Sequence, residues 1–313
     1  MNKIDYLDVF KKLEIDINTV ESLYRYSPVF KFNLKDKYMV LKTTKEKENR
    51  ANHLFEWERF LESKGINVVS PIKIRNENSL FMKDKRWVIY PFIEGRKYNQ
   101  SKEDIKKAGE LLGQIHALEE TSILVSGFKW GEYDEDLYDD LEEECVSIKE
   151  KYKNITEEKS IETFSKIIEQ CKNHRFLELR EVELPMVDAS WDYKANNLVY
   201  KKDGQPFIID LDNSGRIPRI MDLALALMLF HNEIDTAEPR IFNQEEWKIF
   251  KAGYFKYVNL EYNEKKMWQE MLQFVYIDEV LWAISSLEED ESERQKEFIG
   301  SLIGIQSEKY TLE

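Results

Sequence analysis

The chain has little cysteine and no long apolar run. Cys145 and Cys171 are the only cysteines among 313 residues, too few for a disulfide framework and without the pair spacing of a zinc site. No run of about 18 apolar residues occurs, and the first residues are polar and charged, unlike a secretory signal. We therefore expect reduced thiols, no membrane association and a cytoplasmic location.

Basic residues are fewer than acidic residues. The 46 Lys and Arg residues are outnumbered by 60 Asp and Glu, which gives a formal net charge of -14. Binding to a nucleic acid backbone depends on clustered basic side chains. The balance therefore argues against nucleic acid as a partner and favours a cationic one.

Apolar and aromatic residues are plentiful. Hydrophobic residues make up 42% of the chain, with 16 Tyr, 17 Phe and 7 Trp. A chain of this length and composition can bury two separate cores. We expect two lobes that meet at a cleft, in a monomer or a homodimer.

The first third of the sequence has the pattern of a small sheet with one helix. Residues 27–32 and 38–43 favour strands around a polar turn, and residues 45–65 place Leu54, Trp57 and Leu61 at helical spacing before Gly65. Three more short strands are expected at residues 66–74, 79–84 and 86–95. Beyond that point the pattern is helical, except for a predicted hairpin at residues 196–212 that turns at Asp203 and Gly204.

One short segment carries the pattern of phosphoryl-transfer chemistry. Asp192 is followed by Lys194 and Asn197, and Asp210 ends an apolar strand thirteen residues after Asn197. Phosphoryl transfer needs a carboxylate that orients or deprotonates the attacking hydroxyl, together with oxygen ligands that hold Mg²⁺ on the phosphates. A lone Asp is more often a solvated turn carboxylate, but this spacing supplies all three groups.

This segment resembles the catalytic loop of the aminoglycoside phosphotransferase and choline kinase family, which usually reads H-G-D-x-x-x-x-N, and the resemblance covers nearly the whole chain. It implies a bilobal, protein-kinase-like α+β fold with a small β-rich N-terminal lobe at residues 1–93 and a larger, mainly helical lobe at residues 94–313. It also implies a small-molecule kinase that uses ATP, or GTP, with Mg²⁺. By the resemblance, Asp192 faces the acceptor hydroxyl, and Asn197 and Asp210 bind Mg²⁺.

The sequence departs from the family pattern at the start of the loop. Ser190 and Trp191 replace the usual His and Gly, and Lys194 resembles the lysine of the D-x-K-x-x-N loop in protein Ser/Thr kinases, where the amine neutralises the transferring phosphate. Asp212 and the run at residues 215–224 match the family again, and Asp222 resembles its buried brace of the loop. A degenerate pseudokinase is the alternative.

The N-terminal lobe offers a nucleotide site by the same resemblance. Lys42 ends a strand, where kinases place the amine that pairs with ATP phosphates, and Ser27 lies in a piece that resembles the family's phosphate loop. We prefer Glu56 as the helix partner of Lys42, with Glu48 and Glu58 as alternatives. The adenine is expected between Val40 and a segment that contributes Tyr90, Phe92 and Ile93.

Acidic residues suggest where a cationic acceptor binds. Nine of the thirteen positions from Glu132 to Glu144 are acidic; such a run is either a solvated helix face or a recognition surface. Asp278 and Glu279 interrupt an otherwise apolar helix, where a carboxylate needs a reason. The predicted acceptor residues are Asp134, Asp136, Asp139, Asp140, Asp278 and Glu279.

These observations favour an O-phosphotransferase that acts on a cationic natural product such as an aminoglycoside-like or peptide-like antibiotic, for resistance or self-protection. The alternatives are a metabolic kinase for choline, homoserine or a sugar, a weakly active kinase-fold spore-coat or scaffold protein, and a peptide-Ser kinase.

Overall fold

The computed structural model describes residues 3–24, 27–74, 77–118, 123–124, 169, 177–285, 292–305 and 307–312. Their contacts form two compact units. The first runs from the N-terminus to Arg96 and takes in residues 199–213; the second begins at Lys97 and contains residues 177–198 and 214–312. The predicted lobe boundary at residue 93 stays a prediction.

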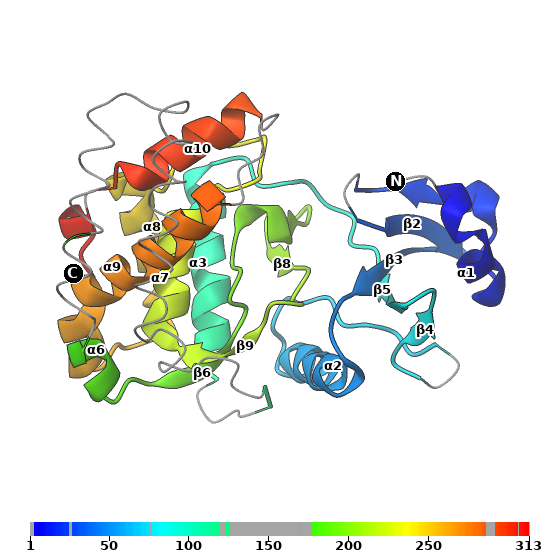
Figure 1. Cartoon of the computed structure of the whole chain (residues 1–313), viewed down its shortest axis with the longest axis horizontal. Helices are drawn as coiled ribbons and strands as arrows, with labels where there is room; N and C mark the ends of the chain where they lie inside the picture. The colour runs from blue at the N-terminus through cyan, green and yellow to red at the C-terminus, as the bar shows by residue number, and fades with distance from the viewer. Residues whose placement is uncertain are drawn as a thin grey trace. The chain divides into compact units, whose positions relative to one another are not determined.

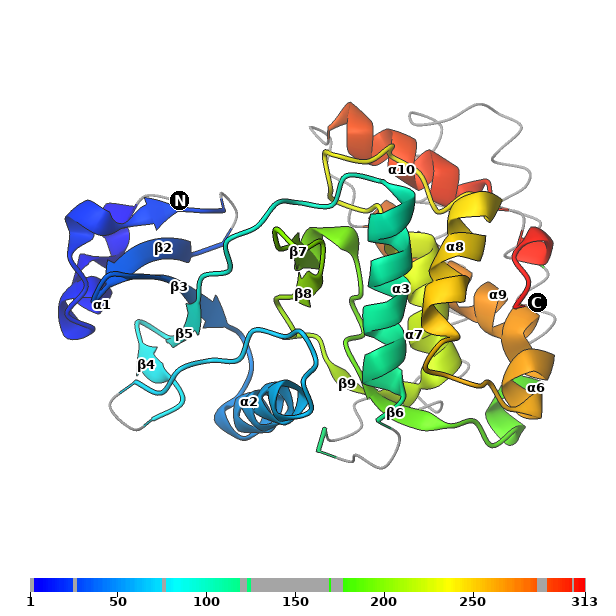
Figure 2. The same ribbon diagram turned by 180° about the vertical axis from the view of Figure 1, so that it is seen from behind.

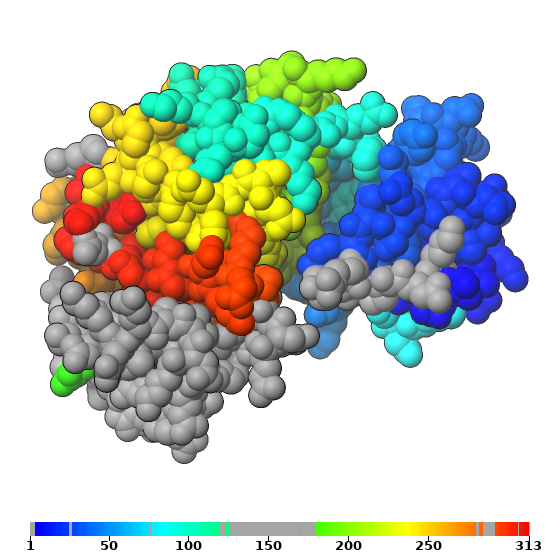
Figure 3. Space-filling view, turned by 90° about the horizontal axis from the view of Figure 1, so that it is seen from above, coloured from blue at the N-terminus to red at the C-terminus, as the bar shows by residue number. Residues whose placement is uncertain are grey.

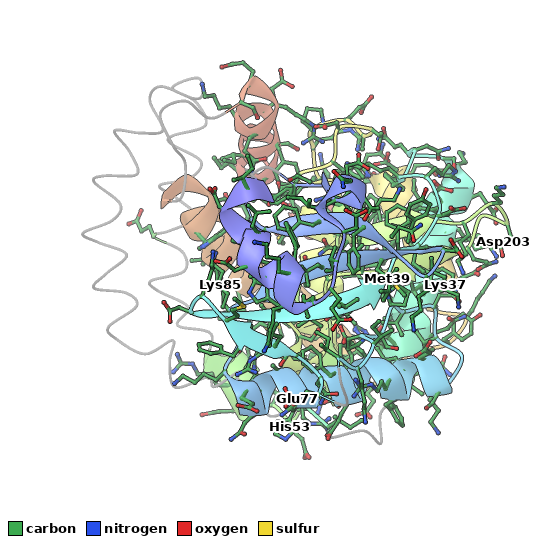
Figure 4. All side chains as sticks on the ribbon, turned by 90° about the vertical axis from the view of Figure 1, so that its right-hand side faces the viewer. Lys37, Met39, His53, Glu77, Lys85 and Asp203 are labelled. Atoms are coloured by element: carbon green, nitrogen blue, oxygen red, sulfur yellow. The ribbon has the colours of Figure 1, made fainter. Side chains whose placement is uncertain are left out.

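The first unit contains a five-stranded sheet in the order β1-β2-β3-β5-β4, with antiparallel neighbours. Its strands are β1 (Glu21–Ser22), β2 (Val29–Leu34), β3 (Lys37–Thr44), β4 (Leu80–Met82) and β5 (Lys85–Pro91). Figure 4 shows Lys37 and Lys85, the first residues of β3 and β5, at opposite ends of the sheet, as antiparallel pairing requires.

Alternating side chains give this sheet two cores. Leu41 and Ile89 point to one face, where they pack with Val9 and Phe10 from the N-terminal segment of η1 (Lys3–Tyr6), α1 (Leu7–Lys12) and η2 (Ile17–Thr19). Val88 on the opposite face packs with residues of α2 (Glu48–Ser63). The sheet is thus covered on both sides.

The strand predicted at residues 66–74 is wrong. This segment makes only isolated bridges, among them Val68 to Ile208 and Ile72 to Ile89. Pro71 lies between them and has no N–H to donate to a ladder, which explains why the pairing does not continue.

The predicted hairpin at residues 196–212 is confirmed. Strands β7 (Leu198–Tyr200) and β8 (Pro206–Ile208) pair, and the turn between them contains Asp203 and Gly204. The hairpin is fastened to the first unit because the Ile208 N–H donates to the Asn67 carbonyl at 2.9 Å and Arg96 exchanges backbone hydrogen bonds with Tyr200.

The second unit is mainly helical. Figures 1 and 2 show α3 and α8 side by side, and the contact is close because a Cβ at Gly109 would lie 2.1 Å from the Phe250 carbonyl oxygen. Two strands, β6 (Met186–Ala189) and β9 (Gly215–Pro218), pair antiparallel. The helices are α3 (Lys102–His116), α6 (Leu177–Glu181), α7 (Arg219–Leu229), α8 (Gln244–Tyr254), α9 (Tyr262–Ser285) and α10 (Glu293–Ile303), with short turns η4 (Ala195–Asn197) and η5 (Ser307–Lys309).

The C-terminal segment is part of this helical unit. Figure 3 shows the red segment, which includes α10, on the surface beside the yellow segment that includes α8. Trp247 and Lys251 of α8 both donate to the Thr311 carbonyl, at 3.1 and 2.7 Å. An antiparallel N-terminal sheet followed by a mainly helical remainder confirms the predicted α+β class. None of the described helices combines the length and apolar character needed to span a membrane.

Candidate active site

Lys42 is the central cation of the first unit. Its side chain is buried in β3, and Nζ lies 2.6 Å from Asp210 Oδ1 and 3.3 Å from Asp212 Oδ2. Burial by itself would lower the pKa of Lys42, but the two carboxylates outweigh it and raise that pKa. The ammonium therefore stays charged at neutral pH.

Asp210 follows β8 in a left-handed backbone conformation, with φ of 62°. Such a conformation costs a non-glycine residue of the order of 1 kcal/mol or more, and it persists where its surroundings fix it. The Asp210 side chain is 54% exposed although one oxygen holds Lys42. It is thus open to a ligand while its backbone is fixed.

The structure corrects the choice of helix acid. Glu56 is exposed on α2, whereas Glu58 is 2% exposed, and its charge acts on Lys42. Leu54, Trp57 and Leu61 define the buried face of the helix, and Glu58, four residues after Leu54, lies on it. The apolar spacing contained this signal, but the prediction did not use it.

Glu58 lies deep in the unit without a full set of partners. Tyr90 donates its hydroxyl to Oε1 at 3.4 Å, and among the described residues Oε2 accepts no hydrogen bond. Burial raises the pKa of Glu58, and the nearby Lys42 only partly opposes this shift.

A pocket of about 160 Å³ lies in the first unit beside Lys42. It brings together the predicted adenine residues Val40, Tyr90, Phe92 and Ile93, and its charged lining residues are Lys42 and Asp210. Ser27 is not part of this lining: it lies in the turn between β1 and β2, where its carbonyl accepts from the Val29 N–H at 2.9 Å.

The second unit holds the loop between β6 and β7, with Asp192 at its centre. Asn197 donates Nδ2 to the backbone oxygen of Asp192 at 3.0 Å and to its Oδ2 at 3.2 Å. Lys194 Nζ lies 3.3 Å from Asp192 Oδ1. Burial raises the pKa of Asp192, although Lys194 and Asn197 oppose the shift. The loop thus presents a carboxylate held from both sides.

The Asn197 side chain fits the part of a metal ligand. Because Nδ2 is engaged by Asp192, the amide oxygen Oδ1 faces elsewhere and accepts no hydrogen bond in the part of the chain that the structure describes. An amide oxygen from Asn197 and a carboxylate from Asp210 are donors that suit Mg²⁺. The assignment of Asn197 and Asp210 as joint ligands stays a prediction.

Lys194 has a second partner that the sequence did not reveal. Its Nζ lies 3.0 Å from Glu233 Oε2, in the turn after α7. Burial by itself would lower the pKa of Lys194, but Asp192 and Glu233 raise it. Glu233 lies in a turn 39 residues after Lys194, and no local pattern links it to the loop.

Asp222, which the sequence predicts as the brace of the loop, contacts Ser190 of the loop. It also contacts His116, which the sequence analysis did not predict. Asp222 is fully buried in α7, and its Oδ2 lies 3.0 Å from His116 Nε2 and 3.5 Å from Ser190 Oγ. With Nε2 protonated, His116 donates to Asp222 and accepts from the Tyr254 hydroxyl at 3.0 Å. A histidine from α3 thus contacts the brace of a loop that has Ser190 in place of its usual histidine.

Trp191 occupies the place of the usual loop glycine, and its φ of 55° explains that preference. Its ring lies over Gly215 of β9, where a Cβ would come within 2.8 Å of Trp191 Cε3. The missing side chain at Gly215 makes room for the indole.

Asp278 and Glu279 are half-buried on α9, and the charges of Asp192 and Lys194 reach Glu279. Burial raises the pKa of Asp278 to about 6. Burial, followed by the charges of Asp278 and Asp192, raises the pKa of Glu279 to about 8. The other predicted acceptor residues, Asp134, Asp136, Asp139 and Asp140, lie outside the described residues.

The raised pKa of Glu279 predicts a pH-dependent stability. Between its ordinary value of 4.5 and about 8, the folded chain binds a proton that the unfolded chain has released. The free energy of unfolding should therefore fall as pH rises through this window, by at most about 1.4 kcal/mol per pH unit for this group. Urea denaturation across the window should show a flatter profile for Glu279→Gln. If the unfolding free energy of wild type and of Glu279→Gln changes equally with pH, the pKa of Glu279 is not raised by burial.

Comparisons with known proteins identify the family of the chain. A model described as the phosphotransferase enzyme family matches residues 25–254. The chain belongs to this family. It is therefore a phosphotransferase enzyme, and the predicted small-molecule kinase is confirmed at that level. The resemblance stated from the catalytic loop is confirmed as well.

Solved structures share the fold at low identity. Amicoumacin kinase hAmiN, in complex with AMP-PNP, Ca²⁺ and Ami, is 15% identical with a TM-score of 0.69, over 98% of this chain and 95% of that one. A microcompartment-associated aminopropanol kinase is 13% identical, TM-score 0.71, over 98% and 97%. Choline kinase LicA from Streptococcus pneumoniae is 15% identical, TM-score 0.56, over 96% and 98%. These likenesses confirm the protein-kinase-like fold. A comparison with curated proteins gives no match.

Proposed function

We propose that the protein transfers the γ-phosphoryl group of ATP, with Mg²⁺, to a hydroxyl of a cationic small molecule such as an aminoglycoside-like or peptide-like antibiotic, in the cytoplasm, for resistance or self-protection. The observation that carries the proposal is the half-buried Asp192 carboxylate, held between Lys194 and Asn197 in the loop between β6 and β7 of a phosphotransferase. Phosphoryl transfer relies on such positioning more than on covalent chemistry.

The pocket of the first unit suits a nucleotide. Its apolar lining residues, among them Val40 and Phe92, can pack against an adenine, and Lys42 can pair with phosphates. The Ile93 N–H, just beyond β5, donates to no group in the described chain, whereas the Phe92 N–H is engaged by the Tyr38 carbonyl. Ile93 therefore has a donor left for the edge of a base. The structure of amicoumacin kinase with AMP-PNP supports a nucleotide of this kind.

Each residue of the loop then has a role in the transfer. Asp192 orients the acceptor hydroxyl and accepts its proton, and burial, which raises its pKa, makes it a stronger proton acceptor than a solvated carboxylate. Lys194 places a positive charge beside that carboxylate, where it can neutralise the transferring phosphate. Asn197 and Asp210 would hold Mg²⁺, which neutralises charge on the phosphates when bound.

The charges of α9 support a cationic acceptor. In the described part of the chain, Asp278 and Glu279 make no ion pair, and burial makes their charged forms unfavourable. A protonated amine of the acceptor would supply the missing counter-charge and lower both pKa values. The acidic run with Asp134, Asp136, Asp139 and Asp140 would extend this surface.

A second candidate acceptor is an amino alcohol such as choline. The aminopropanol and choline kinases share the fold over nearly the whole chain, and their named substrates carry a hydroxyl and a cationic nitrogen. Such a molecule would also satisfy Asp278 and Glu279. A metabolic role would then replace resistance.

A thermal-shift screen and a coupled ATP assay test the proposal. The screen would include Mg²⁺, AMP-PNP and a panel of antibiotics, amino alcohols, neutral sugars and Ser-containing peptides, because a ligand at about 100 times its Kd adds about 2.7 kcal/mol of stability. Each hit would then be tested for stoichiometric ADP formation and a phosphorylated product. Hits confined to neutral sugars would contradict the cationic acceptor, and a hit without phosphate transfer would favour a scaffold.

Neutral substitutions on α9 should weaken acceptor binding alone. The double variant Asp278→Asn with Glu279→Gln removes the two carboxylates that a bound amine would ionise, and in a partly exposed site we expect the acceptor KM to rise roughly tenfold with nucleotide KM unchanged. The matched control is Glu293→Gln, which removes one charge from a side chain that is 85% exposed on α10. An acceptor KM that is the same in wild type and the double variant would exclude α9 from acceptor recognition.

A further inference from the structure

Glu233 combines an unusual backbone with a contact to the catalytic loop. It lies in the turn after α7 with φ of 59°, a left-handed conformation that a glutamate rarely adopts. From this turn, Oε2 reaches to 3.0 Å from Lys194 Nζ, closer than the 3.3 Å between that nitrogen and Asp192 Oδ1. Two carboxylates therefore share one ammonium.

The surrounding structure fixes this turn. Phe230, at its start, accepts a hydrogen bond from the Ala195 N–H of the catalytic loop at 2.8 Å. Arg294 of α10 donates Nη2 to the carbonyls of His231 and Ala237, at 3.1 and 3.2 Å, and to that of Ile234. A strained residue in so well-determined a segment points to a role for its side chain.

We propose that Glu233 is a positioning residue that holds the Lys194 ammonium beside Asp192, a role that rests on the phosphoryl transfer proposed above. A lysine has a flexible four-carbon stem and a point charge, so a single partner leaves its ammonium several positions. The second carboxylate fixes the ammonium from the side of the turn.

A kinetic double-mutant cycle tests whether Glu233 affects turnover through Lys194. Glu233→Gln should lower kcat by roughly 10- to 100-fold, because small misplacements of a catalytic group have effects of this size, while nucleotide KM stays within about twofold. Glu233→Asp should restore part of the loss. In a Lys194→Met background, Glu233→Gln should have no further effect on kcat. The control Asp235→Asn removes an exposed carboxylate from the same turn and should match wild type.

Two results would overturn the proposal: an unchanged kcat in Glu233→Gln, or an equal loss of kcat in the wild-type and Lys194→Met backgrounds. A second cycle needs no acceptor and separates this proposal from the proposed function. The unfolding free energies of Glu233→Gln, Lys194→Met and the double variant should be non-additive if the two side chains pair in solution. Additive values would exclude the pairing even if wild type transfers phosphate, and non-additive values would support it even if every acceptor fails.

Discussion

Replacing Asp192 by Asn should reduce kcat by roughly 10²- to 10⁴-fold, the range expected when a positioned proton acceptor is lost. The amide has the same shape and can still accept hydrogen bonds, but it cannot take the hydroxyl proton. The Asn197 contact to the Asp192 backbone oxygen does not depend on the substituted group, so the loop should keep its conformation. Steady-state kinetics with an acceptor from the screen would measure the loss.

Nucleotide binding is the internal control for this variant. The pocket and Lys42 belong to the first unit, whereas Asp192 belongs to the second, so the thermal shift with Mg²⁺ and AMP-PNP should match wild type. A turnover within about threefold of wild type would remove Asp192 from the chemistry. A lost nucleotide shift would mean instead that the substitution disturbs more than the acceptor hydroxyl.

Replacing Asp210 by Ala should abolish most of the Mg²⁺-dependent part of nucleotide binding. Asp210 is the proposed metal ligand with the half-exposed carboxylate. Lys42 keeps Asp212 at 3.3 Å as a partner, so the variant should fold. The thermal shift with AMP-PNP should then be nearly the same with Mg²⁺ as with a chelator, whereas in wild type Mg²⁺ should add about 1.4 kcal/mol for each tenfold gain in affinity.

The matched control lies on the same hairpin. Asp203 is an exposed turn residue whose Oδ1 accepts from the Gln205 N–H at 3.0 Å, a bond that Asp203→Asn can keep. This variant should show the full Mg²⁺ effect. If Asp210→Ala also shows it, Asp210 is not a metal ligand.

The parts of the site that lie close together in sequence were the easiest to predict. Asp192, Lys194 and Asn197 belong to one short loop, and their hydrogen bonds and ion pair join residues at most five positions apart. The β7–β8 hairpin is equally local, since Asp203 and Gly204 define its turn. Local spacing determines both features.

The errors have different physical causes. Glu56 was preferred over Glu58 because it is the acid nearest in sequence to Leu54, but only Glu58 lies on the buried face that Leu54 and Leu61 define. Residues 66–74 have strand-like composition, but Pro71 interrupts the backbone donors that a ladder needs.

The residues that were missed reach the loop through the tertiary structure. His116 lies 106 positions from Asp222, and Glu233 reaches Lys194 from a turn with no recognisable motif. A histidine on the buried face of an amphipathic helix was a weak signal, because such a residue is more often a satisfied core side chain. For Glu233 the single sequence offered no signal.

The contact between Trp191 and Gly215 makes two distant positions interdependent. Any side chain at position 215 would collide with the indole, and a glycine at position 191 would leave a gap above β9. A chimaera that receives a relative's catalytic loop but keeps its own β9 would therefore combine mismatched halves. Loop and strand form one exchangeable module, and a designer who alters the specificity of this enzyme should move them together.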